Sequence, residues 1–199
     1  DFEPGNPAAS FSIISNAFLV KLTTNGNYVW HKTIPAGGYN YHSVCVDENN
    51  VYLATQTNGT QNMNAGGTTF NVSTLNSSYD IILTKYRKDG MFVTAKAIGG
   101  CTNVDYARGL EVKNGKLVMF GAFTTGTCTP IVDMNGGAPS VTITSNISTK
   151  KDGFLALYDT NLVCQWAKAI GGPDVSDEVW GGTFDNTGNF LVSGQFCGT

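Results

Sequence analysis

The chain has 199 residues, of which 41% are hydrophobic and 11% aromatic, so it can bury a core and is not expected to be disordered. Only 14% of the residues are charged, and a net charge of −3 with scattered lysines and arginines argues against a nucleic-acid partner. No apolar run approaches the ~20 residues of a membrane-spanning helix, so membrane insertion is not expected. The 24 glycines and the many Asn, Ser and Thr residues predict short strands joined by tight turns.

One strand-like segment occurs three times along the chain. Its copies are Phe18–Leu22, Ile82–Tyr86 and Phe154–Tyr158. Each copy is followed by a polar turn and a second shared segment, whose copies are Trp30–Ile34, Thr94–Ile98 and Trp166–Ile170. Ile34 and Ile98 are 64 residues apart, and Ile98 and Ile170 are 72 apart. Self-similarity at a nearly fixed period indicates a repeat architecture.

Each repeat contains two further strand signals. A short alternating segment precedes the shared pair at residues 11–13, 70–72 and 141–143, and a predicted hairpin follows it. In the second repeat this hairpin turns at Asn114-Gly115, the strongest local hairpin signal. We therefore predict an all-β fold of β-propeller blades with about four antiparallel strands each, in units 1–60, 61–126 and 127–199.

Three blades are too few to close a propeller, because known propellers use about four to eight. We therefore expect the chain to be a segment of a larger propeller. The rest of the ring would come from the remainder of a longer chain or from further copies that associate with it.

The third repeat carries a recognisable set of motifs. It reads Asp-Gly-Phe-Leu-Ala-Leu-Tyr-Asp at 152–159, Trp-Ala-Lys-Ala-Ile-Gly-Gly at 166–172 and Asp-Asn-Thr-Gly-Asn-Phe-Leu-Val-Ser-Gly-Gln-Phe at 185–196. This combination resembles the bacterial β-propeller repeat called SBBP. The second repeat keeps Gly-Ala-Phe at 121–123, but the first has Thr-Gln-Thr at 55–57. The resemblance implies a secreted or cell-surface protein, of the kind found in gliding and related Bacteroidota.

Aromatic and basic residues recur at fixed places and are candidate ligand contacts. Trp30 and Trp166 occupy equivalent positions, where they could stack on sugar rings or pack between blades; we favour packing. Lys32, Lys96 and Lys168 recur as well. In a closed ring they would form a circle of positive charge for an anionic ligand, although solvated lysines paired with neighbouring acids are the simpler interpretation.

Two aspartates precede the hairpins by equal spacing. Asp105 and Asp177 each lie four residues before a glycine, and a buried Asp there would accept backbone N–H bonds and fix the loop. A calcium site formed by Asp174, Asp177 and Glu178 is an alternative, because carboxylates close in sequence suit a hard cation. The five cysteines form no CxxC pair. Cys101 and Cys128 could form a disulfide or remain small core residues.

No catalytic triad, phosphate loop or nucleophile elbow is recognisable. We therefore predict a non-catalytic scaffold or binding module of a secreted or cell-surface protein, with no cofactor, that mediates adhesion to an extracellular protein or glycan. The alternative is the propeller domain of a glycosidase-type enzyme whose catalytic residues lie largely outside these repeats. A purely structural spacer is the third possibility.

Overall fold

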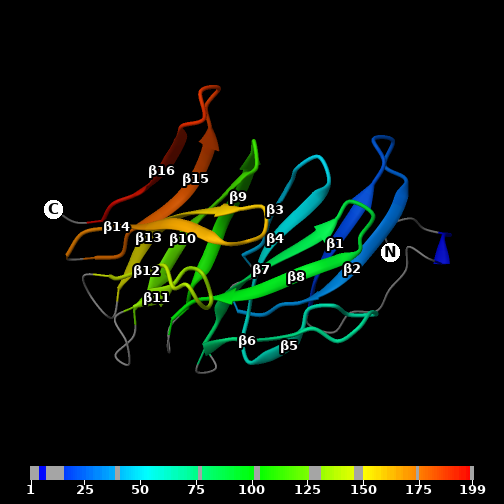
Figure 1. Cartoon of the computed structure of the whole chain (residues 1–199), viewed down its shortest axis with the longest axis horizontal. Helices are drawn as coiled ribbons and strands as arrows, with labels where there is room; N and C mark the ends of the chain where they lie inside the picture. Colours follow the sequence, from blue (N-terminus) through cyan, green and yellow to red (C-terminus); the bar gives the residue numbers. More distant parts are fainter. Residues whose placement is uncertain are drawn as a thin grey trace.

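The computed structural model describes residues 5–7, 16–38, 41–75, 78–100, 104–125, 131–145, 150–173 and 175–197. Within these ranges the regular elements are strands, the strand pairs are antiparallel, and no α-helix occurs. This confirms the all-β class and the expectation of small antiparallel sheets. The described sheets form an open stack and not a closed ring (Figure 1).

Two four-stranded meanders, here called the first and second central sheets, form the middle of the molecule. The first contains, in spatial order, β3 (Ser43–Val46), β4 (Asn50–Thr57), β7 (Asp80–Arg87) and β8 (Phe92–Ile98). The second contains β9 (Tyr106–Lys113), β10 (Lys116–Thr124), β13 (Lys151–Asp159) and β14 (Cys164–Ile170) in the same arrangement. Both sheets are therefore four-stranded, with their strands in chain order.

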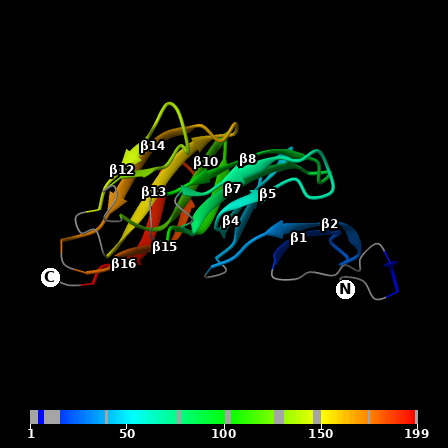
Figure 2. The same ribbon diagram turned by 90° about the horizontal axis from the view of Figure 1, so that it is seen from below.

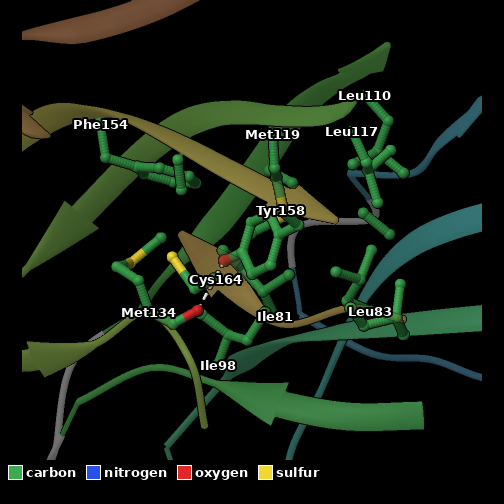
Figure 3. Packing of buried hydrophobic residues seen from close by; sticks show 14 of the residues in the cluster. Ile81, Leu83, Ile98, Leu110, Leu117, Met119, Met134, Phe154, Tyr158 and Cys164 are labelled. Carbon is green, nitrogen blue, oxygen red and sulfur yellow. Dashed lines mark hydrogen bonds between the residues drawn. The ribbon is translucent and has the colours of Figure 1, made fainter. Parts of the chain in front are cut away.

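Four two-stranded hairpins complete the part of the fold that the structure describes. Two of them lie at opposite ends of the long axis, namely β1 (Asn16–Leu22) with β2 (Tyr28–Pro35), and β15 (Glu178–Phe184) with β16 (Phe190–Gln195) (Figure 1). The other two are side hairpins, β5 (Thr60–Asn62) with β6 (Asn71–Ser73), and β11 (Val132–Asp133) with β12 (Thr142–Ile143). A buried tyrosine holds each side hairpin: the hydroxyl of Tyr158 donates to the carbonyl of Met134 at 2.6 Å (Figure 3), and that of Tyr86 to Met63 at 3.5 Å.

The sheets stack face to face, with a hydrophobic layer in each gap (Figure 2). The largest layer lies between the central sheets and includes Leu83, Met119 and Phe154 (Figure 3). Smaller layers join β1–β2 to the first central sheet and β15–β16 to the second. Because each central sheet is covered on both faces, β4 and β10 are buried almost throughout and lack the alternation of a half-exposed strand.

The sheets do not coincide with the predicted units. β3–β4 lie before the boundary at residue 60 and β7–β8 after it, so each central sheet combines strands from two successive repeats. The short segments predicted as first strands of the blades, 70–72 and 141–143, overlap the side hairpins instead, and 11–13 lies outside the described residues. The strand partners predicted from the repeat units are therefore wrong, because spacing along the chain does not specify which hairpins pair.

The predicted hairpin turn at Asn114-Gly115 is confirmed. It joins β9 to β10, and the two residues have φ values of 51° and 75°. A two-residue turn with positive φ at both positions matches the right-handed twist of the flanking strands, which is why Asn and Gly stand there.

Candidate functional site

Two β-bulges occur at equivalent places in β9 and β15. In the β9–β10 ladder Ala107 and Gly109 pair with successive residues of β10, so Arg108 is the extra residue. In the β15–β16 ladder Val179 and Gly181 pair with successive residues of β16, so Trp180 is the extra residue. Arg108 and Trp180 are 72 residues apart, the spacing of the repeat. A bulge redirects the side chain that it carries, so the same device positions both residues.

The bulges explain a glycine of the repeat motif. A Cβ on Gly121 would lie 2.1 Å from the carbonyl oxygen of Tyr106, and a Cβ on Gly194 would lie 2.2 Å from that of Glu178. The backbone of the bulged strand thus fills the space that a side chain would need. The equivalent residue in the first repeat is Thr55, and the β3–β4 ladder runs from Ser43 to Val46 without a register shift.

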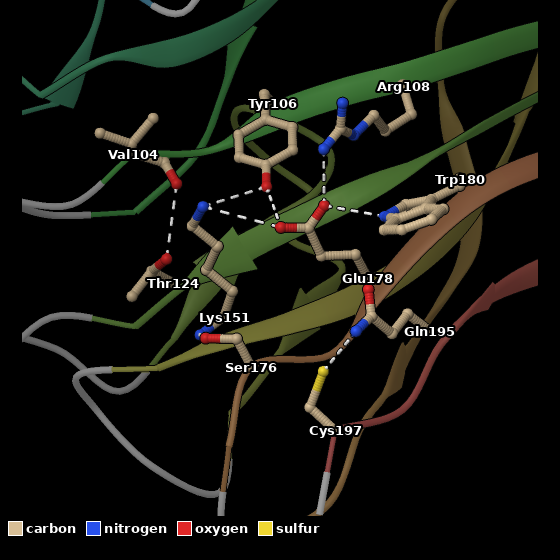
Figure 4. A network of polar contacts seen from close by, with 10 residues as sticks. All are labelled: Val104, Tyr106, Arg108, Thr124, Lys151, Ser176, Glu178, Trp180, Gln195 and Cys197. Atoms are coloured by element: carbon tan, nitrogen blue, oxygen red, sulfur yellow. Dashed lines mark hydrogen bonds and ion pairs between the residues drawn. The ribbon is translucent and has the colours of Figure 1, made fainter.

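The bulges surround Glu178 with donors from three strands (Figure 4). We call Tyr41, Tyr106, Arg108, Lys151, Glu178 and Trp180 the Glu178 cluster. Arg108 Nη2 lies 2.7 Å from Glu178 Oε2, which also accepts from Trp180 Nε1 at 3.0 Å. The Tyr106 hydroxyl donates to Oε1 at 2.5 Å and accepts from Lys151 Nζ at 3.2 Å. Lys151 Nζ is itself 3.7 Å from Oε1.

Aromatic rings cover the cationic side of the cluster. The guanidinium of Arg108 lies 4.2 Å from the ring centre of Tyr41 and 5.1 Å from that of Tyr106. The two rings are themselves 4.5 Å apart. Such cation–π contacts hold the arginine in place while leaving its charge intact. Trp180 is 55% exposed, so the cluster presents an indole to solvent above a partly buried ionic base.

The electrostatics favour a permanently charged cluster. Burial raises the pKa of Glu178, but the hydrogen bonds from Tyr106, Arg108 and Trp180 outweigh burial and leave the pKa below its ordinary value. For Arg108, burial lowers the pKa and the bond to Glu178 more than compensates, so its pKa lies above the ordinary value. Glu178 therefore stays ionised at neutral pH, which suits it to holding other groups and not to donating a proton.

A third residue belongs to the same row. Ser43 pairs with Ala54, and Gly109 pairs with Phe120, the equivalent residue of the next sheet. Ser43 and Gly109 are therefore equivalent. The residues before them, His42 and Arg108, are then equivalent as well. Strands β3 and β9 lie side by side at this point, where the amide of Leu110 donates to Ser43 Oγ at 2.9 Å. His42 is exposed. His42, just before β3, thus occupies the position equivalent to Arg108 on β9 and Trp180 on β15.

The two tryptophans predicted as ligand contacts, Trp30 and Trp166, have different surroundings. The indole N–H of Trp30 donates to the carbonyl of Lys88 at 3.1 Å, and its ring lies 3.1 Å from where a Cβ on Gly90 would be. Trp30 therefore packs against the β7–β8 turn, which favours the packing interpretation. Trp166 is 37% exposed. Neither tryptophan belongs to the Glu178 cluster.

The three recurring lysines differ in their surroundings. Lys32, Lys96 and Lys168 lie on β2, β8 and β14, each in a different sheet. Lys96 Nζ donates to the carbonyl and the side-chain oxygen of Asn135, at 2.8 and 3.0 Å, while Lys168 is exposed. Two other recurring lysines connect neighbouring sheets. Lys21 donates to the carbonyl of Lys88 at 2.9 Å, and Lys85 to that of Thr160 at 2.7 Å.

Both paired aspartates fix their loops as predicted. Asp105 accepts the amides of Gly100 and Thr124, at 2.9 and 3.0 Å. Asp177 accepts those of Gly172 and Cys197, at 2.7 and 2.9 Å. These four bonds occur at equivalent places and tie the start of each hairpin to its end.

The calcium and disulfide predictions fall partly outside the described residues. Asp174, Cys101 and Cys128 are not among them. Asp177 and Glu178 direct their carboxylates to different protein donors, and the described residues contain no group of three potential metal ligands. The described cysteines Cys45, Cys164 and Cys197 are free thiols.

Sequence reasoning identified Glu178 for a different role and missed Tyr41, Arg108 and Trp180. A usable signal existed: Arg108-Gly109 and Trp180-Gly181 follow the paired aspartates at the same offset. No protein-family model matches the chain, and a search of curated proteins finds no relative. Among the described residues no helix is long and apolar enough to cross a membrane.

Proposed function

We propose that the chain is a segment of an SBBP-type β-propeller that acts as a non-catalytic binding module of a secreted or cell-surface protein. The ligand that fits the Glu178 cluster best is an extracellular glycan. The strand order of the central sheets and their face-to-face stacking support the propeller. The low charge content and the Asn- and Thr-rich composition are compatible with an extracellular setting.

The observation that carries the proposal is the exposed indole of Trp180 on a rigid base. Its N–H is held by Glu178, and the bulge directs the ring away from the sheet. An immobilised aromatic face offers apolar contact to the C–H face of a sugar at little entropic cost. Arg108, which pairs with Glu178, and the exposed His42 occupy the equivalent positions of the two preceding sheets.

The carboxylates argue for binding and not for glycoside hydrolysis. A glycosidase needs an accessible pair of carboxyl groups, one of which has a raised pKa and acts as the acid. Among the described residues, burial raises the pKa of Asp80 to about 6 and that of Asp105 to about 8. Both side chains are fully buried and accept backbone amides, so they serve the loops. Glu178, near the surface, has the opposite shift.

A printed array of neutral and anionic oligosaccharides tests the proposal. We expect the chain to bind one class of glycan, Trp180→Ala to weaken that binding about tenfold or more, and Trp180→Phe to retain most of it. Met91→Ala, at an exposed residue on a different sheet, is the control and should bind normally. Binding by Trp180→Ala at the wild-type level would contradict the assignment of the site. Hydrolysis of an array glycan would favour the glycosidase alternative.

A further inference from the structure

The two end hairpins are complementary halves of one central sheet. In the first central sheet β4 pairs with β7, and in the second β10 pairs with β13. Strand β16 is equivalent to β4 and β10, and β1 is equivalent to β7 and β13. Among the described residues β16 pairs only with β15, and β1 only with β2. The β15–β16 hairpin therefore corresponds to the first two strands of a central sheet, and the β1–β2 hairpin corresponds to the last two.

The exposure of the apolar side chains shows what each half lacks. Leu191 and Phe196 are 54% and 70% exposed, whereas the equivalent residues of β10, Val118 and Phe123, are at most 1% exposed. At the other end Leu22 is 44% exposed, while its equivalents Tyr86 and Tyr158 are at most 2% exposed. Apolar residues on both open hairpins thus occupy positions that the central sheets bury.

A size rule governs the contacts between neighbouring sheets. Trp30 on β2 packs on the turn of the neighbouring sheet at Gly90, which has φ +86°. One repeat later the tryptophan is replaced by Thr94, and the turn position carries Leu162 in place of glycine. Leu162 keeps a positive φ of 64° and is fully buried between the central sheets. A large side chain on the strand therefore contacts a turn with glycine. A small side chain on the strand is matched by a turn with a large residue.

The same rule describes the open ends. Trp166 stands at the position of Trp30 and is 37% exposed, so its matching turn should carry glycine. The β1–β2 turn has Gly26 at the position of Gly90, with φ +84° and nothing within 4 Å of a Cβ added there. The exposed tryptophan is on β14 and the open glycine turn joins β1 to β2, so the two lie in different sheets.

We propose that the β1–β2 hairpin of a second copy of this chain docks on β16 and completes the third sheet. By analogy with the β4–β7 ladder, Val192 would lie opposite Val20 of the second copy, and Leu191 opposite Lys21. Trp166 would then cover the turn at Gly26, as Trp30 covers the turn at Gly90. The joint is head-to-tail, so it either closes into a ring or continues as a filament.

The number of copies follows from the sheets. The described residues of one 199-residue copy supply two central sheets and the two halves of a third. Two copies give six sheets, within the range of about four to eight found in propellers, whereas three copies would give nine. The number of copies depends on the proposed function, because it assumes a propeller. The pairing of β1 with β16 does not depend on it. Glycan binding through Trp180 and assembly through Trp166 are measured separately, so either can fail alone.

Sedimentation of the 199-residue chain over a range of concentrations tests the joint. We expect twice the 21.2 kDa mass of one chain. Trp166→Thr and Gly26→Leu should each raise the dissociation constant about tenfold or more, because one leaves a gap and the other a clash. The double variant reproduces the Thr94 and Leu162 combination and should restore the dimer. Circular dichroism shows whether each variant is folded.

Cross-linking tests the register without depending on the size variants. A Val20→Cys chain mixed with a Val192→Cys chain should form a disulfide between copies on mild oxidation, because directly opposed side chains share a face. A Lys21→Cys chain mixed with Val192→Cys should not, since adjacent residues point to opposite faces. Three outcomes would overturn the proposal: a monomer at about 0.1 mM, a double variant no better than the single ones, or equal cross-linking of both pairs. A monomer whose β16 amides resist hydrogen exchange would show that another segment occupies the edge.

Discussion

Arg108 on β9 and Glu178 on β15 form an ion pair of 2.7 Å although 70 residues separate them. The pair joins the second central sheet to the end hairpin, and both side chains are largely buried. It also holds the base on which Trp180 stands. The chain has an exposed counterpart in Arg87 and Asp89, 2.9 Å apart within one turn. The two pairs make it possible to separate a structural ion pair from a surface one.

Removing the charge of Glu178 should destabilise the fold. Glu178→Gln leaves Arg108 without its counter-charge and directs an amide N–H₂ at a donor, which we expect to lower the free energy of unfolding by about 1–2 kcal/mol. Asp89→Asn should change it by less than about 0.5 kcal/mol, because the pair is exposed. Urea denaturation measures both. Equal losses from the two variants would contradict the structural role of Glu178.

Stability should fall as the pH rises from about 5 to about 8. Burial raises the pKa of Asp80 to about 6 and of Asp105 to about 8, from an ordinary value of 3.8. Between the ordinary pKa and the raised pKa of each aspartate, the folded protein binds more protons than the unfolded one. The stability that the two protonated aspartates contribute is therefore complete at low pH and is lost as the pH rises through about 6 and about 8. Urea denaturation at about pH 5 and about pH 8 measures the difference.

A variant isolates the contribution of Asp105 to this pH dependence. Asp105→Asn should be less stable at every pH and should show a smaller change with pH, because it cannot titrate. Burial lowers the pKa of His42, which acts in the opposite direction, so the comparison with the variant is more informative than the wild type alone. An unchanged pH profile in Asp105→Asn would exclude this residue as a source.

The glycine opposite the bulge should not tolerate a side chain. Gly121→Ala places a Cβ against the backbone oxygen of Tyr106, which cannot move aside as a flexible side chain could, and we expect a loss of about 3 kcal/mol or more. Gly115→Ala meets no neighbour and suffers only from its φ of 75°, so its loss should be about 1 kcal/mol. Thermal unfolding ranks the two, and the reverse order would show that the bulge is not rigid.

Two recurring lysines should differ in their effect on stability. Lys96→Met removes the ammonium that holds Asn135, and we expect a loss of about 1.5–3 kcal/mol together with faster proteolysis of the β11–β12 hairpin. Lys168→Met, at the exposed equivalent position, should change neither quantity measurably. Limited proteolysis followed by mass spectrometry gives both readouts. Similar behaviour of the two variants would mean that Lys96 is no more than a solvated residue.

Much of the local structure was predictable because it depends on neighbours in sequence. The Asn114-Gly115 turn and the strands at 82–86 and 154–158 follow from turn chemistry and apolar patterning. The buried aspartates Asp105 and Asp177 were also predictable from their spacing before the hairpins. Each of these features is determined within a few residues.

The pairing of hairpins and the Glu178 cluster were not predictable in the same way. A strand at 82–86 has the same pattern whichever hairpin it joins, so the choice of β4 as its partner depends on packing. Trp180 is redirected by a bulge, whose presence depends on Gly194 in the opposite strand. Nothing in the sequence indicates that Arg108 and Glu178, which are 70 residues apart, form an ion pair.

The sharing of each central sheet between successive repeats has a consequence for protein engineering. A truncation at residue 60 separates β4 from β7 and leaves two solvent-exposed edges, which are prone to aggregation. A boundary between β8 and β9, in residues 99–105, divides neither central sheet. The four-stranded sheet is thus offset from the sequence repeat, and grafting or deleting a sheet should follow the offset boundaries. Linking the sheets in this way also means that removing the middle repeat would open both central sheets, whereas removing either outer repeat would open one.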